Sequence, residues 1–349
     1  MINRILFFGL SVLLIGCFFV VFGLDLDRAT LQRFSGFTMG TSYEIQLVTD
    51  RNSIDIKTVE ENVADLLRRL DREIFSTYSP TSELTQLNMT PVTEVFSASR
   101  ELIEVLVLSE EIRALTDGAF DISINPLVNL WGFGAQSERI VSRLPTQLEI
   151  DEAMARMGAE YLVINESNFE VFKTKDIEID LSGVAKGYAV DEVAVALEDF
   201  NIDSYFIEVG GEIKLKGFKP SNEEWLPAIE APAAGTYEIY EVLSSRGEAF
   251  SLAGSGDYRN YFEIDGARYS HEIDPRTGRP VTHDLAAAFV ITESAAEADA
   301  LATAFMILGL KESKSVIDKH SISAFLISRV NENHFEHFVT STFAQYVLK

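Results

Sequence analysis

A short segment in the middle of the chain has residue types suited to binding phosphate. It runs from Asp180 to Asp191 and reads Asp-Leu-Ser-Gly-Val-Ala-Lys-Gly-Tyr-Ala-Val-Asp. Gly183 and Gly187 let the backbone approach a ligand closely, and Lys186 supplies a positive charge. A helix beginning here would add free N–H groups and a partial positive charge. The alternative is an ordinary joint between a strand and a helix that carries a solvated lysine.

Two oxygen-bearing side chains near the C-terminus have the spacing of one helix face. Asp299 and Thr303 lie four residues apart, so a helix projects them from the same side. A carboxylate and a hydroxyl suit Mg²⁺, which keeps other positions for water and phosphate. The small residues Ala298, Ala300 and Ala302 leave room for another backbone to approach. A surface aspartate beside an ordinary helix threonine is the alternative.

Three further candidates stand in turns or at a strand end. Met39 lies at the tip of a tight turn, and Tyr78 lies in a polar loop where it could stack on a ligand. His271 ends a predicted strand beside a turn that Pro275 and Gly278 make rigid. Local packing, an exposed loop tyrosine and a structural histidine are the respective alternatives.

Hydrophobic spacing predicts the elements that must position these residues. Ile177, Ile179 and Leu181 alternate with polar residues, and helical spacing follows from Val184, which predicts a strand that ends abruptly in a helix. Other helices are predicted from Val59, over Ser99–Leu115, from Thr146 to Gly158 and from Ser294. Strands are predicted at Arg33–Phe37, Tyr43–Leu47, Tyr161–Ile164, Phe169–Phe172, Ser204–Val209, Ile213–Lys216, Leu226–Glu230, Tyr237–Leu243, Ala249–Leu252, Ile322–Ile327 and Phe335–Val339, with a hairpin around Asp265 and Gly266.

The length and charge of the chain limit the classes of function. With 349 residues, the chain can bury a large core in one domain or in two intimate ones. A formal net charge of −25 argues against binding to nucleic acid or anionic lipid, because both would be repelled. The acidic surface suits a site that recruits a divalent cation.

The N-terminus predicts a membrane tether. Ile5 to Leu24 is an uncharged run of 20 residues that follows Arg4, long enough to cross a bilayer. Within it, Leu-Ile-Gly-Cys ending at Cys17 is similar to a bacterial lipobox, in which the cysteine is lipidated; an uncleaved signal anchor is the alternative. Both place the remainder of the protein outside the cytoplasm. Cys17 is the single cysteine, so an internal disulfide is excluded.

The order of the motifs resembles the bacterial ApbE family, the flavin transferases that move FMN from FAD to a threonine of a partner protein. The motifs that carry the resemblance are Thr38–Thr41, Ser76–Tyr78, Thr116–Asp121, Pro126–Gly134, Asp180–Asp191, Val209–Gly211, Gly254–Tyr258, His271–Pro280 and Glu297–Thr303. The resemblance implies an α+β fold of two closely joined α/β subdomains with the flavin site between them. The expected domain covers residues 33–349, after an anchor at 1–24 and a spacer at 25–32.

The resemblance also assigns roles to individual residues. Asp299, Thr303 and the main-chain carbonyl of Gly183 match ligands of Mg²⁺. The expected FAD contacts are Met39, Tyr78, Ala119, Phe120, Asp121, Asp180, Lys186, His271 and Ile273. Lys186 and a protonated His271 would stabilise charge on the phosphates, and Asp299 would help to remove the threonine proton. These three are the expected catalytic residues.

Two positions depart from the pattern of the family. Ser123 stands where threonine is common, which keeps a hydroxyl. Glu272 stands where an aliphatic residue is usual, and its carboxylate would repel a diphosphate unless the side chain points to solvent.

The function implied is the transfer of FMN from FAD to a threonine hydroxyl, with Mg²⁺ as cofactor and AMP as leaving group. The expected acceptor is an exported or membrane protein, a subunit of a membrane redox complex, at the periplasmic face of the bacterial inner membrane. With water as acceptor, the same site would make a metal-dependent FAD pyrophosphatase. A non-catalytic flavin-binding lipoprotein is the alternative of a different class.

Overall fold

A computed structural model describes residues 29–348, except for 51–53, 136–142, 234–237, 259–260, 265–266 and 332–333. The predicted anchor at 1–24, Cys17, the first half of the spacer at 25–32 and the hairpin tip at Asp265 and Gly266 lie outside the described residues, and the second half of the spacer begins the first strand. No helix in the described part is long and apolar enough to cross a membrane.

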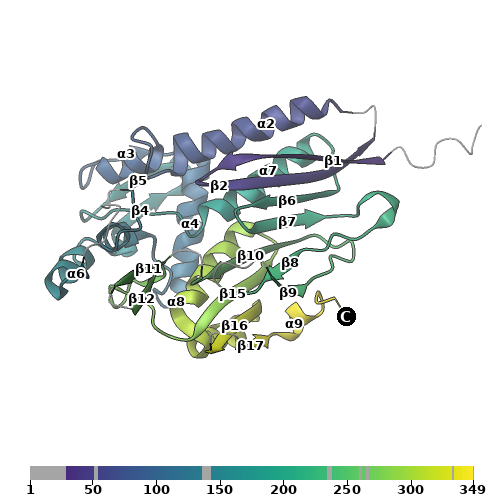
Figure 1. Cartoon of the computed structure of the whole chain (residues 1–349). Coiled ribbons are helices and arrows are strands. Elements are labelled where there is room, and N and C mark those ends of the chain that lie inside the picture. The colour runs from purple at the N-terminus through teal and green to yellow at the C-terminus, as the bar shows by residue number, and fades with distance from the viewer. Residues whose placement is uncertain are drawn as a thin grey trace, which may run out of the picture.

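An antiparallel sheet of eight strands forms the centre of the molecule (Figure 1). The strands follow the spatial order β1-β2-β6-β7-β10-β15-β16-β17, and each pairs antiparallel with its neighbours. Their bounds are β1 Ala29–Thr38, β2 Thr41–Asp50, β6 Tyr205–Val209, β7 Glu212–Lys216, β10 Phe250–Gly256, β15 Leu285–Thr292, β16 Ser323–Asn331 and β17 His334–Val339.

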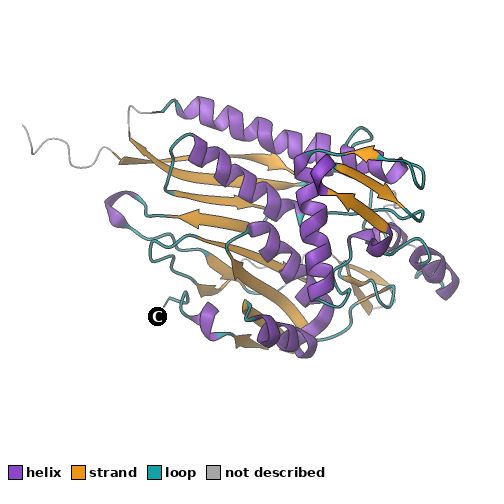
Figure 2. Cartoon of the chain, turned by 180° about the vertical axis from the view of Figure 1, so that it is seen from behind, coloured by secondary structure: helices purple, strands orange, loops and turns teal. Residues whose placement is uncertain are grey.

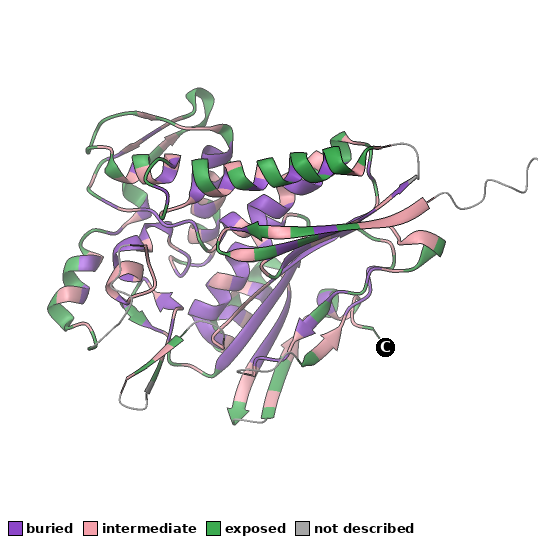
Figure 3. Cartoon of the chain, turned by 45° about the horizontal axis from the view of Figure 1, so that its top comes forward, coloured by how far each residue is buried: buried purple, intermediate pink, exposed green. Residues whose placement is uncertain are grey.

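Both faces of the central strands are buried. In β15, Ala288 and Val290 join the core on one face, whereas Phe289 and Ile291 join a second core on the other. The two-residue period of a strand sends alternate side chains to opposite faces, which explains why β15 is apolar along its length. Figure 3 shows that the central strands are buried, while the outer side of a neighbouring helix is exposed.

Four long helices lie over one face of the sheet (Figure 2), where three contact its strands and the fourth, Arg100–Leu115, packs on another helix, Ala295–His320. They are α2 Ile56–Arg69, extended by the π-helix η1 Leu70–Phe75, α4 Arg100–Leu115, α7 Ala185–Asp199 and α8 Ala295–His320. The largest core lies between these helices and the sheet. On α2, Val59, Val63 and Leu67 are the buried positions, so the predicted helical spacing is confirmed.

Smaller elements surround this two-layer arrangement. A three-stranded sheet has the order β3-β5-β4, and the hairpins β11–β12, β13–β14 and β8–β9 form two-stranded sheets. The bounds are α3 Glu83–Met89, β3 Phe96–Ser97, η2 Ile122–Ile124, α5 Asn125–Leu130, α6 Gln147–Met154, η3 Ala159–Tyr161, β4 Leu162–Asn165, η4 Glu166–Asn168, β5 Glu170–Lys173, η5 Pro220–Asn222, β8 Ala228–Glu230, β9 Ile239–Val242, β11 Tyr261–Ile264, β12 Ala267–Ser270, β13 Ile273–Asp274, β14 Arg279–Pro280 and α9 Ser341–Ala344. A third core, which includes Trp131 and Ile273, lies among α5, α6 and these hairpins.

The prediction of a strand over Ile177–Leu181 is wrong, although Ile177, Ile179 and Leu181 are buried as their spacing predicts. The segment is extended but belongs to no sheet. The side chain of Asn88 donates to the Ile179 carbonyl at 2.8 Å and accepts from the Ile179 N–H at 2.7 Å. The Asn88 side chain therefore makes with Ile179 the two hydrogen bonds that a neighbouring strand would make.

The other predicted elements are found with shifted ends. The helix that begins after Thr146 has the predicted capping box with Glu149, but it ends at Met154 and not at Gly158. Ser294 caps α8, as predicted, by accepting from the Glu297 N–H. The mixed α/β architecture agrees with the predicted fold class, whereas the division into two subdomains stays a prediction.

Candidate active site

The N-terminal ends of α7 and α8 meet at a glycine. A Cβ atom on Gly187 would lie 2.2 Å from the carbonyl oxygen of Ala295 and 2.7 Å from the Cα atom of Ala296. Glycine is therefore required at this crossing, and small residues on α8 allow the close approach that the sequence suggests. The contact brings Lys186 of α7 beside Asp299 of α8.

Lys186 lies between two buried carboxylates. Its Nζ atom is 3.4 Å from Asp299 Oδ2 and 3.2 Å from Glu212 Oε1, and the Gly187 N–H donates to Asp299 Oδ2 at 3.0 Å. The side chains of Glu212 and Asp299 are 3% and 5% exposed, whereas that of Lys186 is 26% exposed. The glycine turn and the helix start thus carry a lysine that is partly open to solvent, as a phosphate-binding role requires.

The charges of this cluster are strongly coupled. Burial opposes the charge on Lys186, but Asp299 and Glu212 hold the pKa of Lys186 above its ordinary value. Burial raises the pKa of the Glu212 carboxyl, against the lowering effect of Lys186. The raised pKa, about 8, favours the protonated and uncharged form of Glu212 near neutral pH, so the ion pair of the cluster is the one between Lys186 and Asp299.

Gly183 lies against the same helix, as predicted. A Cβ atom on Gly183 would be 3.3 Å from Cγ2 and 3.4 Å from Oγ1 of Thr303. Thr303 lies one turn beyond Asp299 on α8, so the Gly183 backbone lies beside the part of α8 that carries both side chains. Phe120 borders the same point, with its Cε2 atom 3.2 Å from the position of that Cβ atom.

The residues present fit a hard divalent cation. Asp299, Thr303 and the Gly183 carbonyl are oxygen donors, and Oε2 of Glu212 is buried without a hydrogen-bond partner among the described residues. In the described part of the chain, no group of three or more His, Cys, Asp or Glu side chains could hold a metal ion. Mg²⁺ needs few protein ligands, because it keeps several water ligands, and the oxygen donors named here are of the type that it takes. The metal assignment itself stays a prediction.

Asp121 and Ser123 form a local hydrogen-bonded turn. Asp121 Oδ1 accepts from the N–H and the hydroxyl of Ser123 at 2.8 and 2.6 Å, and burial raises the pKa of Asp121. The Ser123 hydroxyl also accepts from the Gly158 N–H at 2.8 Å. Serine therefore makes use of the hydroxyl that it shares with the more usual threonine.

Asp180 connects this turn to the start of α7. Its N–H donates to the Ile122 carbonyl at 2.7 Å, and its Oδ1 accepts from the N–H of Ser182 at 2.8 Å. The predicted FAD contacts at Ala119–Asp121 and at Asp180 are therefore neighbours in space. Ala119 and Phe120 are themselves buried.

Two other predicted site residues, Tyr78 and His271, both lie near Phe133. The Tyr78 hydroxyl is 3.5 Å from the Phe133 carbonyl oxygen, and the ring centroids of Phe133 and His271 are 6.2 Å apart. The Tyr78 side chain is exposed, as a stacking residue would be. The whole residue Ile273 is 2% exposed and belongs to the third core, and its contact with FAD stays a prediction.

Glu272 is oriented differently from the expectation. Its side chain does not point to solvent, because it is 4% exposed and accepts a hydrogen bond from the Ser255 hydroxyl at 2.7 Å. His271 Nε2 lies 3.5 Å from the same Oε1 atom. The carboxylate is therefore held by β10 and the neighbouring histidine.

Comparison with known proteins agrees with this geometry. The model of the ApbE family matches residues 39–326. The chain belongs to the ApbE family.

Relatives and solved structures of the ApbE family cover nearly the whole of the described region. A protein of Vibrio cholerae named FAD:protein FMN transferase is 37% identical over 315 residues, which are 90% of this chain and 92% of the relative. The Escherichia coli protein of the same name is 33% identical over 90% of this chain and 88% of its own length. The structure of the flavin transferase ApbE from Vibrio cholerae has a TM-score of 0.82 at 34% identity, covering 91% of this chain and 99% of that one. The apo flavinyl transferase ApbE of Pseudomonas stutzeri has a TM-score of 0.83 at 34% identity, covering 93% and 98%.

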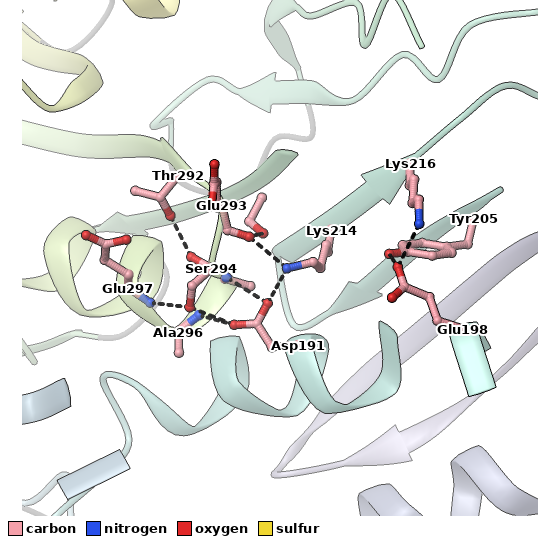
Figure 4. Close-up of polar contacts among 12 residues, drawn as sticks. Asp191, Glu198, Tyr205, Lys214, Lys216, Thr292, Glu293, Ser294, Ala296 and Glu297 are labelled. Carbon is pink, nitrogen blue, oxygen red and sulfur yellow. Dashed lines mark hydrogen bonds and ion pairs between the residues drawn. The ribbon is translucent and has the colours of Figure 1, made fainter. Parts of the chain in front are cut away.

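Glu212 and Asp191 were missed as parts of the ApbE-like site. Glu212 directly follows the motif Val209–Gly211, and a buried acidic residue after a glycine turn is a signal that could have indicated it. Asp191 is the last residue of the segment Asp180–Asp191, and its carboxylate accepts hydrogen bonds from the first N–H groups of α8 (Figure 4). Neither partner is close in sequence, so spacing alone does not reveal the contacts.

Met39 belongs to a hairpin turn whose last residue, Thr41, lies close to Lys186. It occupies the tip of the β1–β2 hairpin with a φ of 48° and borders a cavity of about 520 Å³. The neighbouring Thr41 reaches the same glycine as Lys186, because a Cβ atom on Gly210 would lie 2.7 Å from Thr41 Cγ2 and 3.3 Å from Lys186 Cδ. Thr41 therefore lies beside Lys186, whereas the contact of Met39 with FAD stays a prediction.

Proposed function

We propose that this chain transfers FMN from FAD to a threonine hydroxyl of an acceptor protein, in a reaction that depends on Mg²⁺ and releases AMP. That the chain is an enzyme, a flavin transferase, agrees with the names of its relatives at 33–37% identity. The observation that carries the finer proposal is the meeting of Lys186 on α7, and of Gly183 in the turn before it, with Asp299 and Thr303 on α8.

The proposed reaction exchanges one phosphate bond for another. The threonine oxygen attacks the phosphorus of the FMN half, and the bond between that phosphorus and the bridging oxygen breaks, so AMP leaves with the bridging oxygen. Mg²⁺, when bound, neutralises the phosphate oxygens and polarises this phosphorus. Lys186 stabilises the charge that develops on the diphosphate, and the Asp299 carboxylate takes the proton of the threonine hydroxyl.

The structure supports these roles through charge and exposure. Lys186 is the partly exposed member of its cluster, so its ammonium group is open to a ligand. Asp299 is held by the Gly187 N–H through Oδ2, while the contact of Oδ1 with Lys186 is long at 3.5 Å. The oxygen Oδ1 is thus the freer of the two for a cation or a proton.

The test is covalent labelling of an acceptor. The wild-type protein is incubated with FAD, Mg²⁺ and a flavoprotein acceptor, and mass spectrometry looks for an FMN adduct on threonine. We expect labelling by the wild-type protein and by Glu198→Gln, a substitution near the far end of α7, and loss of labelling by Asp299→Ala. Labelling by Asp299→Ala at the wild-type rate would contradict the metal and base assignment. Rapid AMP release without any acceptor would instead favour the pyrophosphatase.

We also propose that the acceptor is reached at the periplasmic face of the bacterial inner membrane, as a subunit of a membrane redox complex. The support is the uncharged run from Ile5 to Leu24 and the acidic surface. Cell fractionation and protease accessibility of the full chain would test this location, and protection of the domain by an intact inner membrane would contradict it.

A further inference from the structure

A carboxylate on α7 satisfies the first backbone N–H groups of α8. Asp191 accepts from the Ala295 N–H through Oδ1 and from the Ala296 N–H through Oδ2, both at 3.0 Å, and it accepts from the Ser294 hydroxyl at 2.8 Å (Figure 4). The first N–H groups of a helix have no partner within the helix. Ala295 and Ala296 are 0% and 2% exposed, so water does not serve as a substitute.

A lysine on β7 completes the joint. Lys214 Nζ lies 2.6 Å from Asp191 Oδ1 and donates to the Glu293 carbonyl at 2.7 Å. The strand, the helix α7 and the residue before the α8 cap are thus bound to one another. Figure 4 shows these contacts converging on Asp191.

The capping is reciprocal between the two helices. Asp299 of α8 accepts from the Gly187 N–H in the first turn of α7, while Asp191 of α7 accepts from the first turn of α8. The contact of Gly187 with Ala295 prevents the two helices from moving closer together. The hydrogen bonds of Asp191 with Ala295 and Ala296 keep them from moving apart. Because Lys186 and Asp299 lie within one turn of these contacts, the joint sets their separation.

We propose that Asp191 and Lys214 are positioning residues, which hold α8 in the register that brings Asp299 and Thr303 to Gly183 and Lys186. Their effect on catalysis runs through α8. The catalytic part of this inference rests on the proposed function, whereas the part that concerns the joint does not. Without Asp191, two buried N–H groups lose their acceptor, and the beginning of α8 shifts or opens.

The chain offers a matched control on the same two elements. Glu198 of α7 pairs with Lys216 of β7 at 3.0 Å and accepts from the Tyr205 hydroxyl at 2.9 Å (Figure 4). These partners lie on β6 and β7, so the pair resembles Asp191 and Lys214 in chemistry but not in its connection to α8. Asp191→Asn and Lys214→Gln are therefore compared with Glu198→Gln and Lys216→Gln.

The first measurement is hydrogen exchange in the metal-free protein, read on peptides that cover residues 294–303. Asp191→Asn should speed exchange there by about fivefold or more, because one of the two N–H groups loses its acceptor oxygen, and one such hydrogen bond contributes on the order of 1 kcal/mol. The control variants should leave this exchange unchanged. Equal protection in Asp191→Asn and wild-type protein would overturn the joint, whatever the protein catalyses.

The second measurement is Mg²⁺ binding in the presence of FAD, followed by calorimetry. Loss of a residue that orients metal ligands typically weakens affinity by about 10-fold or more, and we expect this of Asp191→Asn and, to a smaller extent, of Lys214→Gln. The control variants should stay within about twofold of wild type. In turnover assays, kcat should fall while the KM for the acceptor is kept.

The outcomes separate the inference from the proposed function. A lower Tm with unchanged Mg²⁺ affinity would show that Asp191 is merely structural, and would overturn the positioning role. If Asp191→Asn does not fold, the same exchange and Mg²⁺-binding measurements are made on Lys214→Gln, with Lys216→Gln as its control. Failure of the wild-type protein to bind FAD and Mg²⁺ would sink the proposed function and the positioning role, while the exchange experiment would still decide the joint.

Discussion

Lys173 is a buried lysine that contacts backbone oxygens. Its Nζ atom donates to the Asn88 carbonyl at 2.8 Å and lies 3.3 Å from the Ile177 carbonyl oxygen, and the residue is 1% exposed. Burial lowers the pKa of Lys173 below its ordinary value of 10.5. The side chain thus ties the segment before Asp180 to α3 at some electrostatic cost.

This cost makes the stability depend on pH in a known direction. Between the lowered pKa and 10.5, the unfolded chain binds the proton of Lys173 more tightly than the folded protein does, so the free energy of unfolding rises with pH. We expect the difference in unfolding free energy between wild type and Lys173→Met to grow in favour of wild type from pH 7 to pH 10. Each unit of pKa lowering is about 1.4 kcal/mol. Denaturant titrations that give a constant difference would contradict a lowered pKa.

Met39 carries backbone strain at the tip of the β1–β2 hairpin. Met39 and Gly40 join Thr38 to Thr41 with φ values of 48° and 74°, the conformation of a tight hairpin turn that favours asparagine before glycine. Met39→Asn should therefore raise the free energy of unfolding by about 1 kcal/mol and weaken FAD binding, if Met39 contacts the flavin.

A second strained residue provides the control for Met39. Phe169 has a φ of 53° and is 45% exposed in the turn before β5. Phe169→Asn should give a comparable gain in stability without changing the Kd for FAD. Equal FAD affinity of Met39→Asn and wild type, measured by flavin fluorescence, would remove Met39 from the site.

Sequence spacing predicted the site residues that lie on one element or in one turn. Asp299 and Thr303 share a helix face, and Gly183 and Lys186 flank the start of α7, so their local relation followed from periodicity. Glu212 was not predicted, because the lysine that it pairs with lies on a different element.

At the scale of elements, the segment 177–181 shows how a side chain can replace a strand. Ile179 is fully buried, and Asn88 provides the partner for both its N–H and its carbonyl group. Alternation of buried and polar residues requires only an extended backbone, so the sequence pattern does not distinguish this arrangement from a paired strand. The chain runs on to Asp180 and the first turn of α7, so the amide fixes how the phosphate-binding segment begins.

Removal of this amide should therefore be costly. Asn88→Ala leaves two buried backbone groups without a partner, which is expected to lower the free energy of unfolding by about 2 to 4 kcal/mol. Gln86→Ala, on the same helix, removes a side chain that bonds the Pro80 carbonyl at the surface, and should cost less than about 0.5 kcal/mol. Similar urea midpoints for the two variants would contradict the role of Asn88.

At the scale of the molecule, three cores of unequal size support the site. The largest lies between the helices and the central sheet and includes residues of α7 and α8, whereas the third lies among α5, α6 and short hairpins. Stacked rings of Trp131, Tyr269 and Phe262 connect the hairpin β11–β12 to this third core. In the described part of the chain, β11 and β12 pair with each other alone.

This arrangement predicts uneven stability. Amides of β15 and β16, which have strand neighbours on both sides, should exchange hydrogen only on global unfolding. Amides of β11 and β12 should exchange through local opening, with a lower free energy. Hydrogen exchange is followed by NMR at increasing denaturant. We expect the opening free energies of the two groups of amides to become equal only at high denaturant concentration. Equal opening free energies without denaturant would contradict separate units.

The alternating apolar residues predicted most strands of the large sheet, but not their order. β2 lies beside β6 and β10 beside β15, and these neighbours are distant in sequence. Such pairing depends on which buried faces fit together, which spacing within one segment does not contain.

The contact between Lys186 and Asp299 spans 113 positions of the chain. During synthesis, α7 is complete long before α8 exists, so a chain that stops short of Asp299 carries the lysine and the glycine turn without the opposing carboxylate. A ligand held between the two helices stabilises only a molecule that has both. On the proposed function, we expect that FAD stabilises the full chain against proteolysis and gives no such protection to a product truncated before α8.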